Sequence, residues 1–328
     1  MTRFLVVRLL QGVAIVLLVV TLTFVLVRLA PGDPFQRMIE GSPASPQLIA
    51  QARERAGLDL PIHQQYVRYV AHVARGDLGD SFSERRPVWD AIRERIPATF
   101  VLAFTALLID FILGISIGAA QGARPGSRID DALTTATLTL YSIPVFWLGV
   151  VLMLLFSLIL GWFPIEGSKS SVGYDQLPIL GRFLDRLHHL ILPALTLGIV
   201  GAAGTARYQR AAMLDAIRQN FVRSARAKGL TESVVIFRHA LRNSLLPTIT
   251  LFGLSFPILL SGSVLVETVF GWPGLGRFVV EAIESRDYPV VTGGAIVTAT
   301  MVVLGNLLAD VLYWMADPRT RPETWSEG

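Results

Sequence analysis

Cysteine is absent from this chain of 328 residues, and charged residues are scarce. Without cysteine, the protein has no disulfide bonds and no thiolate ligands for a metal ion. Charged side chains make up 16% of the residues, against about 25% in soluble globular domains. Hydrophobic residues make up 52%. This composition argues against an ordinary soluble domain and favours an integral membrane protein.

Six apolar runs are each long enough to cross a bilayer, which takes about 20 residues in a helix. They predict an all-α fold with an N-terminal transmembrane helix within 1–30. The first run is longer than the apolar core of a signal peptide and lacks a cleavage site, so we expect it to be retained. The five further transmembrane helices are predicted at 98–121, 132–160, 190–208, 244–267 and 289–314.

The distribution of basic residues predicts the orientation, because arginine and lysine in short loops mark the cytoplasmic side. With a cytoplasmic N-terminus, the inner segments hold 14 basic residues, whereas the short outer loops hold five. The longest inner loop is then 207–243, and residues 316–328 form a cytoplasmic tail. Both termini are therefore expected in the cytoplasm, and the net charge of +4 does not indicate nucleic-acid binding. The inner basic residues outside that loop are Arg3, Arg8, Arg124, Arg128, Arg319 and Arg321.

The long outer segment 31–97 contains helix start and stop signals and is predicted to form a small helical extracytoplasmic cap. Proline favours the first helical position, and glycine favours the position after a helix end. Trp89 is expected to anchor the last cap helix at the membrane interface. Three cap helices are predicted: Ser45 to Gly57, Pro61 to Gly76, and Pro87 onward into the second span.

Small residues recur at helical spacing within two of the predicted spans. Such spacing lets helix backbones approach closely, either within this chain or at an interface with a second membrane subunit. Pro144 and Pro257 fall inside apolar runs, where proline removes a backbone hydrogen bond and kinks a helix. The small residues are Gly114, Gly118 and Gly122 in one span and Gly198, Gly201 and Gly204 in another.

Acidic residues within the spans are rare and therefore candidates for function. They are Asp110 and Asp310, with Glu267 at a span end. The stretches around the two aspartates lack the GxGD-like loop of intramembrane aspartyl proteases, which disfavours that activity. The segment "EGSKSS" (166–171) lacks the glycine spacing of a phosphate-binding loop. We expect no nucleotide site on this chain.

The stretch "NFVRSARAKGL" (220–230) is a basic, small-residue segment in the long inner loop. Ala225 and Gly229 are four residues apart, so they share a helical face where a partner could approach closely. Asn220 can cap the start of this helix and Gly229 can end it. Asn243-Ser244 can cap the next span. The residues alone leave a second interpretation open, that of a basic loop held at anionic lipid headgroups.

The stretch "FVRSARAKGL…RHALRNSLLPTIT" resembles the cytoplasmic coupling loop of permease subunits from binding-protein-dependent ABC importers. In that motif Glu-Ala-Ala precedes a glycine. Arg223, Ser224 and Ala225 take the three places here, and Gly229 is the glycine. The glutamate is missing and Leu246-Pro247 is displaced, as in the peptide and nickel importer branch.

Five other segments support the same branch along nearly the whole chain. Together, in this order, they make the resemblance specific to the first permease subunit of oligopeptide and dipeptide importers. The resemblance implies the type I ABC importer permease fold, with a transmembrane domain over 95–315. The segments are "RLAPGDP" (28–34), "LGDSF" (78–82), "IPVFWLG" (143–149), "VETVFGWPGLG" (266–276) and "ADPRTR" (316–321).

The resemblance implies a non-catalytic permease subunit of the inner membrane, embedded in lipid. It would form half of the pathway for peptides that an external binding protein delivers. A second permease and two cytoplasmic ATPases are the expected partners; ATP and Mg²⁺ would be used by the ATPases, and this chain would bind no cofactor or metal. The expected ATPase-coupling residues are Arg223, Ser224, Ala225, Arg226, Gly229, Leu246 and Pro247.

Two alternatives remain at this point. The same machinery could import nickel, glutathione or another small solute. An ion-coupled secondary transporter, which needs no ATPase, should show internal repeats and charges at the membrane midplane. The sequence shows no clear repeat.

Overall fold

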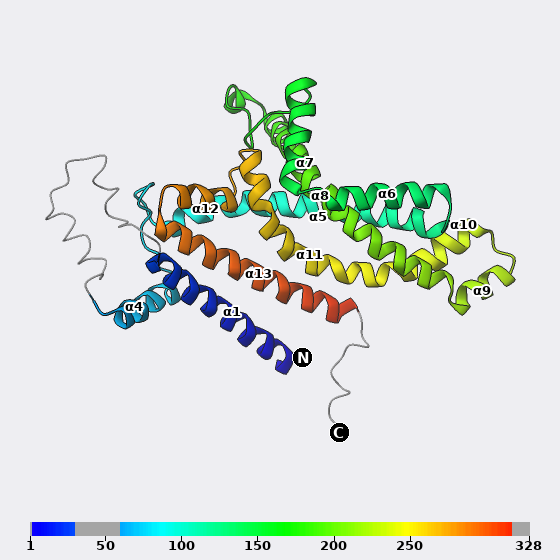
Figure 1. The fold of residues 1–328 in the computed structure, drawn as a ribbon, viewed down its shortest axis with the longest axis horizontal. Helices are drawn as coiled ribbons and strands as arrows, with labels where there is room; N and C mark the ends of the chain where they lie inside the picture. The colour runs from blue at the N-terminus through cyan, green and yellow to red at the C-terminus, as the bar shows by residue number, and fades with distance from the viewer. Residues whose placement is uncertain (1, 30–59, 317–328) are drawn as a thin grey trace. The chain divides into compact units, whose positions relative to one another are not determined.

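The computed structural model describes residues 2–29 and 60–316, which form helices joined by loops, with no strand in these ranges (Figure 1). The chain divides into two compact units. Unit 1 combines Met1–Pro97 with Gly274–Leu304, and unit 2 combines Ala98–Pro273 with Gly305–Gly328. Because α5 (Val88–Ala123) and α13 (Tyr288–Ala316) cross these boundaries, each contributes to both units.

Unit 1 is built on α1 (Thr2–Leu29), α4 (Ile62–Ala74), α12 (Leu275–Glu284) and the first turns of α5 and α13. The sequence analysis missed α12. Its apolar residues recur at the three- and four-residue spacing of an amphipathic helix, which is the signal that could have revealed it. The buried core of the unit consists of Val88, Ala91 and Ile92 from α5, Leu275, Phe278 and Ala282 from α12, and Val290 from α13.

The predicted cap helices are partly confirmed. Helix α4 begins after Pro61, and Gly76 follows its end with a φ of 79°. Tyr66 of α4 lies against Phe24 of α1, with ring centroids 5.4 Å apart, and its hydroxyl is 2.7 Å from that of Thr21. The predicted helix over 45–57 lies outside the described residues. The third cap helix continues directly into the second span as predicted, because α5 runs from Val88 through Pro97 to Ala123.

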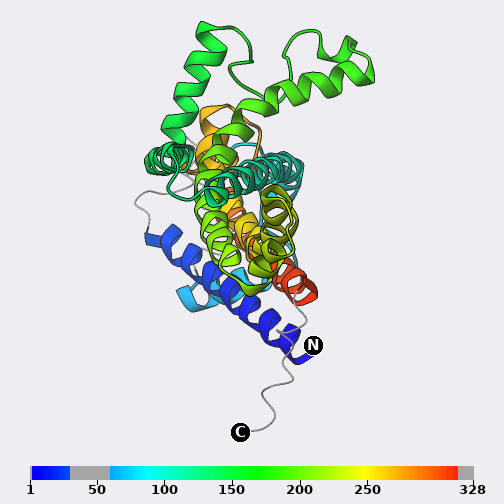
Figure 2. The same cartoon turned by 90° about the vertical axis from the view of Figure 1, so that its right-hand side faces the viewer.

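Unit 2 holds the long helices α8 (Ile179–Ile217) and α11 (Leu241–Val269) together with α6 (Arg128–Ser142) and the remainder of α5. In Figures 1 and 2, the chain after α7 and the first turns of α8 project beyond the other helices of this unit. The shorter elements are α7 (Val145–Leu152), the π-helix η1 (Met153–Ile159), η2 (Tyr174–Gln176), α9 (Asn220–Ala227), α10 (Glu232–Val234) and the π-helix η3 (Val235–Ala240).

The predicted glycines pack α5 against α8 within this chain. A Cβ added to Gly118 would lie 2.4 Å from the carbonyl oxygen of Ala206, and one added to Gly122 would lie 2.4 Å from Cβ of Met213. A Cβ added to Gly114, Gly198 or Gly201 would also lie too close to the opposite helix, at 2.6 Å from its nearest atom. A Cβ added to Gly204 would make an ordinary contact, 3.7 Å from the Tyr141 ring. Of the two interpretations of these glycines, the structure supports packing inside the chain for all but Gly204.

Four described helices are long and apolar enough to cross a membrane: Val6–Leu26, Val88–Ala123, Ile179–Ile217 and Tyr288–Val311. The span predicted at 132–160 is not one straight helix. It bends by 102° between α6 and α7 at Pro144, as expected of proline. Helix α11 covers the span predicted at 244–267 and continues through Pro257, where the expected kink stays a prediction. The count of six spans remains a prediction.

We predict that Gly118→Ala destabilises the protein, because the added methyl group would clash with the backbone of α8. Overpacking of this kind costs about 1–3 kcal/mol. The melting temperature of the purified protein in detergent measures the effect. Gly204→Ala is the matched control, since its Cβ would make an ordinary contact at 3.7 Å. Equal melting temperatures for the two variants would contradict the close packing of α5 and α8.

Candidate functional site

The predicted inner loop is almost wholly helical. Helix α8 continues to Ile217, and residues 218–240, which we name the connecting segment, lead through α9, α10 and η3 directly into α11. Gly229 follows α9 with a φ of 75°, so it ends this helix as predicted. The predicted cap at Asn220 is wrong, because the capping position is Gln219 and no side chain caps the helix. The pair Asn243-Ser244 lies inside α11, since the helix arrives already formed from η3.

One face of α9 is buried within the connecting segment. Val222 and Ala225 pack against Val235 and Ile236 of η3 and against Met213 of α8. The small side chain of Ala225 therefore fits a contact inside the chain and does not leave an exposed hollow for a partner. This corrects the argument that placed Ala225 on a docking face. Gly229 is exposed, and nothing lies within 4 Å of an added Cβ.

The connecting segment also carries exposed apolar side chains along with exposed basic ones. Phe221, Leu230 and Phe237 are 38%, 40% and 62% exposed. Among the predicted coupling residues, Arg223, Ser224, Arg226 and Pro247 are exposed, and the side chain of Leu246 lies outside the described residues. Apolar side chains of this size at the surface mark interaction sites when they gather together.

Arg226 is engaged within the connecting segment. Its Nη2 and Nε donate to the two carboxylate oxygens of Glu232 at 2.6 and 3.1 Å. This ion pair lowers the pKa of the Glu232 carboxyl below its usual range. Since both side chains are exposed, the pair joins α9 to α10 at the surface and contributes little to stability.

One turn of α8 that the sequence analysis did not single out joins this segment to the rest of unit 2. Gln209 bonds to α11, and Arg210 forms a bidentate ion pair with Asp130 at the start of α6, both N···O distances being 2.8 Å. Arginine and aspartate near span ends are common in sequences, so only the fold reveals which of them meet.

The acidic residues inside the spans accept hydrogen bonds from neighbouring hydroxyls. Asp110 of α5 accepts from Thr205 of α8 at 2.6 Å, and Glu267 of α11 accepts from Thr99 of α5 at 2.7 Å. Both acids are buried. These bonds satisfy polar groups that would otherwise be costly in the hydrocarbon region. Asp310 lies on α13 and is partly buried.

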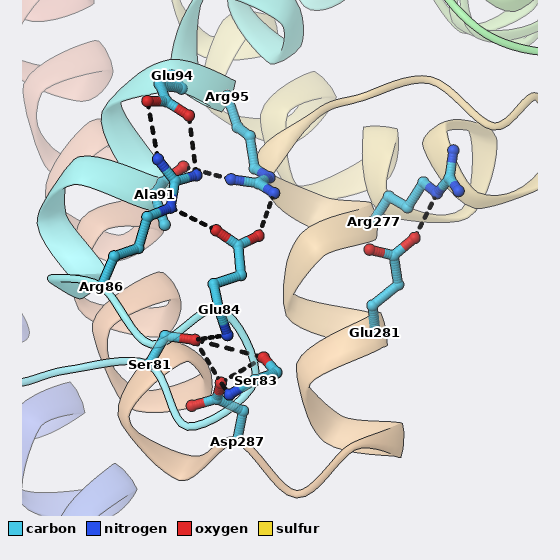
Figure 3. Close-up of polar contacts among 10 residues, drawn as sticks. All are labelled: Ser81, Ser83, Glu84, Arg86, Ala91, Glu94, Arg95, Arg277, Glu281 and Asp287. Atoms are coloured by element: carbon cyan, nitrogen blue, oxygen red, sulfur yellow. Dashed lines mark hydrogen bonds and ion pairs between the residues drawn. The ribbon is translucent and has the colours of Figure 1, made fainter.

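A second polar cluster lies in unit 1 and explains the "LGDSF" motif. Figure 3 shows Ser81 and Ser83, from the loop before α5, converging on Asp287, which precedes α13. Both hydroxyls donate to Oδ2 of Asp287 at 2.6 Å, and the backbone N–H of Ser83 donates to it at 2.9 Å. Burial opposes ionisation of Asp287, but these hydrogen bonds outweigh it and hold the pKa of the carboxyl below its usual range.

Arginine–glutamate pairs fix the same loop to α5 (Figure 3). Arg86 forms a bidentate pair with Glu94 at 2.8 Å and also bonds to Glu84. Arg95 bonds to Glu84 at 2.6 Å, and its guanidinium lies 3.7 Å from the ring centre of Phe278 in α12. These contacts join the loop, α5 and α12 within unit 1.

We predict that Asp287→Asn destabilises the protein at neutral pH, because it replaces a fully buried carboxylate that accepts four hydrogen bonds. Hydrogen bonds to charged groups contribute about 1.5–3 kcal/mol. The folded-state pKa is depressed, so the contribution is present above the unfolded pKa of about 4 and is lost as the pH falls through the folded value.

The measurement is denaturant unfolding of both proteins in detergent between pH 3 and pH 8. The difference between them should be largest at neutral pH and shrink toward the acid end. Glu281→Gln is the control, because this residue forms only an exposed ion pair with Arg277. A difference that does not depend on pH would contradict an ionised Asp287.

Comparison with known proteins gives matches over nearly the whole chain. The profile of the family described as "Binding-protein-dependent transport system inner membrane component" matches residues 110–322. A second profile, for the N-terminal part of such membrane components, matches residues 1–103. The two profiles together cover both units, including the connecting segment and the loop before α5.

Several curated relatives are similar over nearly their full length. The di/tripeptide transport system permease protein DppB of Pseudomonas aeruginosa is 44% identical over 315 residues, covering 92% of this chain and 94% of the relative. The oligopeptide transport system permease protein AppB of Bacillus subtilis is 39% identical over 320 residues, covering 97% and 99%. The glutathione transport system permease protein GsiC of Salmonella paratyphi A is 40% identical over 314 residues, covering 96% and 97%.

Two solved structures share the fold. A chain of the MetNI methionine ABC transporter in an inward-facing conformation aligns with a TM-score of 0.55 and 17% identity, over 68% of this chain and 95% of that one. A chain of an amino acid ABC transporter aligns with a TM-score of 0.50 and 18% identity, over 69% and 94%. At this identity the likeness bears on the fold alone, and it supports the type I importer permease fold that the sequence resemblance implies.

Proposed function

Because this chain belongs to the family of binding-protein-dependent transport system inner membrane components, we propose that it forms half of the translocation pathway for short peptides. The chain is a multi-pass membrane protein and a permease subunit of an ABC importer. The observation that carries the peptide assignment is the sequence identity of 39–44% to di/tripeptide and oligopeptide permeases, over more than nine-tenths of the chain.

Glutathione is the second candidate substrate, favoured by the 40% identity to a glutathione permease. Glutathione is itself a tripeptide, so the two candidates share a chemical class.

The family works with an ATPase and a solute-binding protein. We propose that the complete importer contains this chain, a second homologous permease, two ATPase subunits on the cytoplasmic side and one external binding protein. ATP and Mg²⁺ are then used on the ATPase subunits, and this chain is not catalytic. Both termini lie in the cytoplasm, which agrees with the concentration of basic residues in 207–243.

The exposed face of the connecting segment is the proposed docking surface for the ATPase. Its apolar side chains Phe221, Leu230 and Phe237 can enter a pocket, while Arg223 and Lys228 can pair with acidic groups around it. The proposed contact thus moves from the small, buried side chain of Ala225 to these larger, exposed side chains.

We predict that Phe237→Glu releases the ATPase subunits from the purified importer, because it removes an apolar anchor and adds a charge. Loss of one buried aromatic anchor costs about 2 kcal/mol or more, roughly thirtyfold in affinity. The amount of ATPase that copurifies with this chain measures the effect. Phe183→Glu is the matched control, since Phe183 of α8 is also 62% exposed but lies outside the connecting segment. Equal retention of the ATPase by both variants would exclude this face.

We predict that proteoliposomes containing the complete importer accumulate labelled dipeptides or tripeptides only when ATP and the binding protein are present. Unlabelled peptides and glutathione are added separately as competitors to rank the two candidate substrates. Competition by glutathione alone would favour the second candidate. Uptake that persists without the ATPase subunits would favour an ion-coupled transporter and contradict the proposed function.

A further inference from the structure

One turn of α8 contacts two neighbouring helices through consecutive side chains. Nε2 of Gln209 donates to Oγ of Ser244 at 2.8 Å, and Oγ1 of Thr248 donates to Oε1 of Gln209 at 2.6 Å, so Gln209 is joined to α11. The next residue, Arg210, donates from Nε and Nη2 to Oδ1 and Oδ2 of Asp130 in the first turn of α6, both at 2.8 Å. Consecutive residues of a helix point in different directions, which allows the same turn to hold two partners.

Met213 adds a third helix to this contact. Its Cβ would lie 2.4 Å from a Cβ at Gly122 of α5, and its sulfur accepts a hydrogen bond from Ser244 at 3.2 Å. The turn 209–213, which we name the clasp, therefore holds α5, α6 and α11 together.

Gln209 of the clasp and Asp130, the partner of Arg210, are buried and hydrogen-bonded, whereas the Arg210 side chain is one-third exposed. Gln209 is 0% exposed and Asp130 is 2% exposed. Asp130 also accepts from the backbone N–H of Gly126 at 3.0 Å and from Oγ1 of Thr134 at 3.3 Å. A buried carboxylate that loses its cation is strongly disfavoured. The ion pair thus resists any sliding of α6 along α8.

The clasp is also the place where the connecting segment meets the long helices. Met213 belongs to the hydrophobic cluster that includes Val222 and Ala225 of α9 and Val235 of η3. Helix α8 is unbroken from the clasp to Ile217. A displacement of the connecting segment is therefore passed to the clasp through packed side chains and through a continuous helix.

A displacement of the clasp can be passed on to two other helices, α11 and α6. Gln209 leads to α11, which carries Glu267 near its other end. Arg210 leads to α6, which ends at the 102° bend before α7. A rigid-body shift of α6 would change the position of that bend, whereas a loose contact at Asp130 would absorb the shift.

We propose that Gln209 and Arg210 are positioning residues that transmit displacement of the connecting segment to α11 and α6. This inference rests on the proposed function, because it assumes that an ATPase moves the segment. Gln209 passes the motion to α11, and Arg210 passes it to α6. Loss of either contact leaves ATP hydrolysis running while less substrate crosses the membrane for each ATP consumed.

The test measures peptide uptake and ATP hydrolysis in the same proteoliposomes, using the complete importer and a labelled tripeptide. For Arg210→Gln, uptake per ATP should fall at least about fivefold, the lower end of typical coupling effects, while stimulated hydrolysis stays close to that of the unmodified importer. Arg210→Lys should recover part of the loss, because lysine keeps the charge but not the bidentate geometry.

A milder variant of the clasp and a control variant elsewhere in the chain are measured in the same assay. Thr248→Val is nearly isosteric and removes only one hydrogen bond to Gln209, so it should fold and show a smaller fall of the same kind. Arg277→Gln removes an exposed ion pair on α12 and should change neither rate. Copurification of all subunits and the melting temperature are recorded for each variant.

Failure of the clasp proposal and failure of the proposed function would give different results in this assay. Uptake per ATP that is unchanged in Arg210→Gln and Thr248→Val would overturn the inference. So would a parallel loss of uptake and hydrolysis in both variants, because the clasp would then serve assembly alone. Failure of the proposed function would be visible before any substitution, as an absence of ATP-dependent peptide uptake by the unmodified importer.

Discussion

The close approach of α5 and α8 is the contact on which the rest of unit 2 depends. At Gly114, Gly118 and Gly122 the backbone of α5 lies so near α8 that a methyl group would meet it at less than 3 Å. Helices in a bilayer gain little from the hydrophobic effect, so close van der Waals packing is a main source of their association. The glycines make this packing available, and the polar residues beside them are brought into bonding range as a consequence.

Polar contacts of α8 lie beside this packing. Asp110 meets Thr205 in the middle of the pair, and the clasp lies toward the end of α8 that leads into the connecting segment. Because α8 runs through both regions without a break, the exposed connecting segment and the buried bundle are mechanically continuous. Unit 1 uses a different arrangement, in which the loop before α5 is fixed by Asp287 and by paired arginines and glutamates.

Local signals predicted local features well. Pro144 predicted a break, and the chain bends there by 102°. Gly229 predicted a helix end, and its positive φ confirms it. Predictions that depended on neighbours fared worse. Ala225 was expected on an exposed face but lies in a core, since helical spacing shows that residues share a face without showing what covers that face.

Two predicted helix starts were wrong for a related reason. The caps expected at Asn220 and at Asn243-Ser244 were wrong. The same polar residue types occur at the start of a helix and within one, so the residues alone do not distinguish the two positions. Tertiary packing decides between the two, as it does for α8, which is much longer than the apolar stretch within it.

The sequence by itself determined that this chain is a helical membrane protein, because its low charge and long apolar runs fit no aqueous fold. Its ordered motifs also identified the importer family. Only the tertiary structure decided which side chains meet. Arg210 and Asp130 are 80 residues apart, and Ser81 and Asp287 are 206 apart. Such contacts depend on the packing of whole helices, and no local pattern around either partner specifies the other.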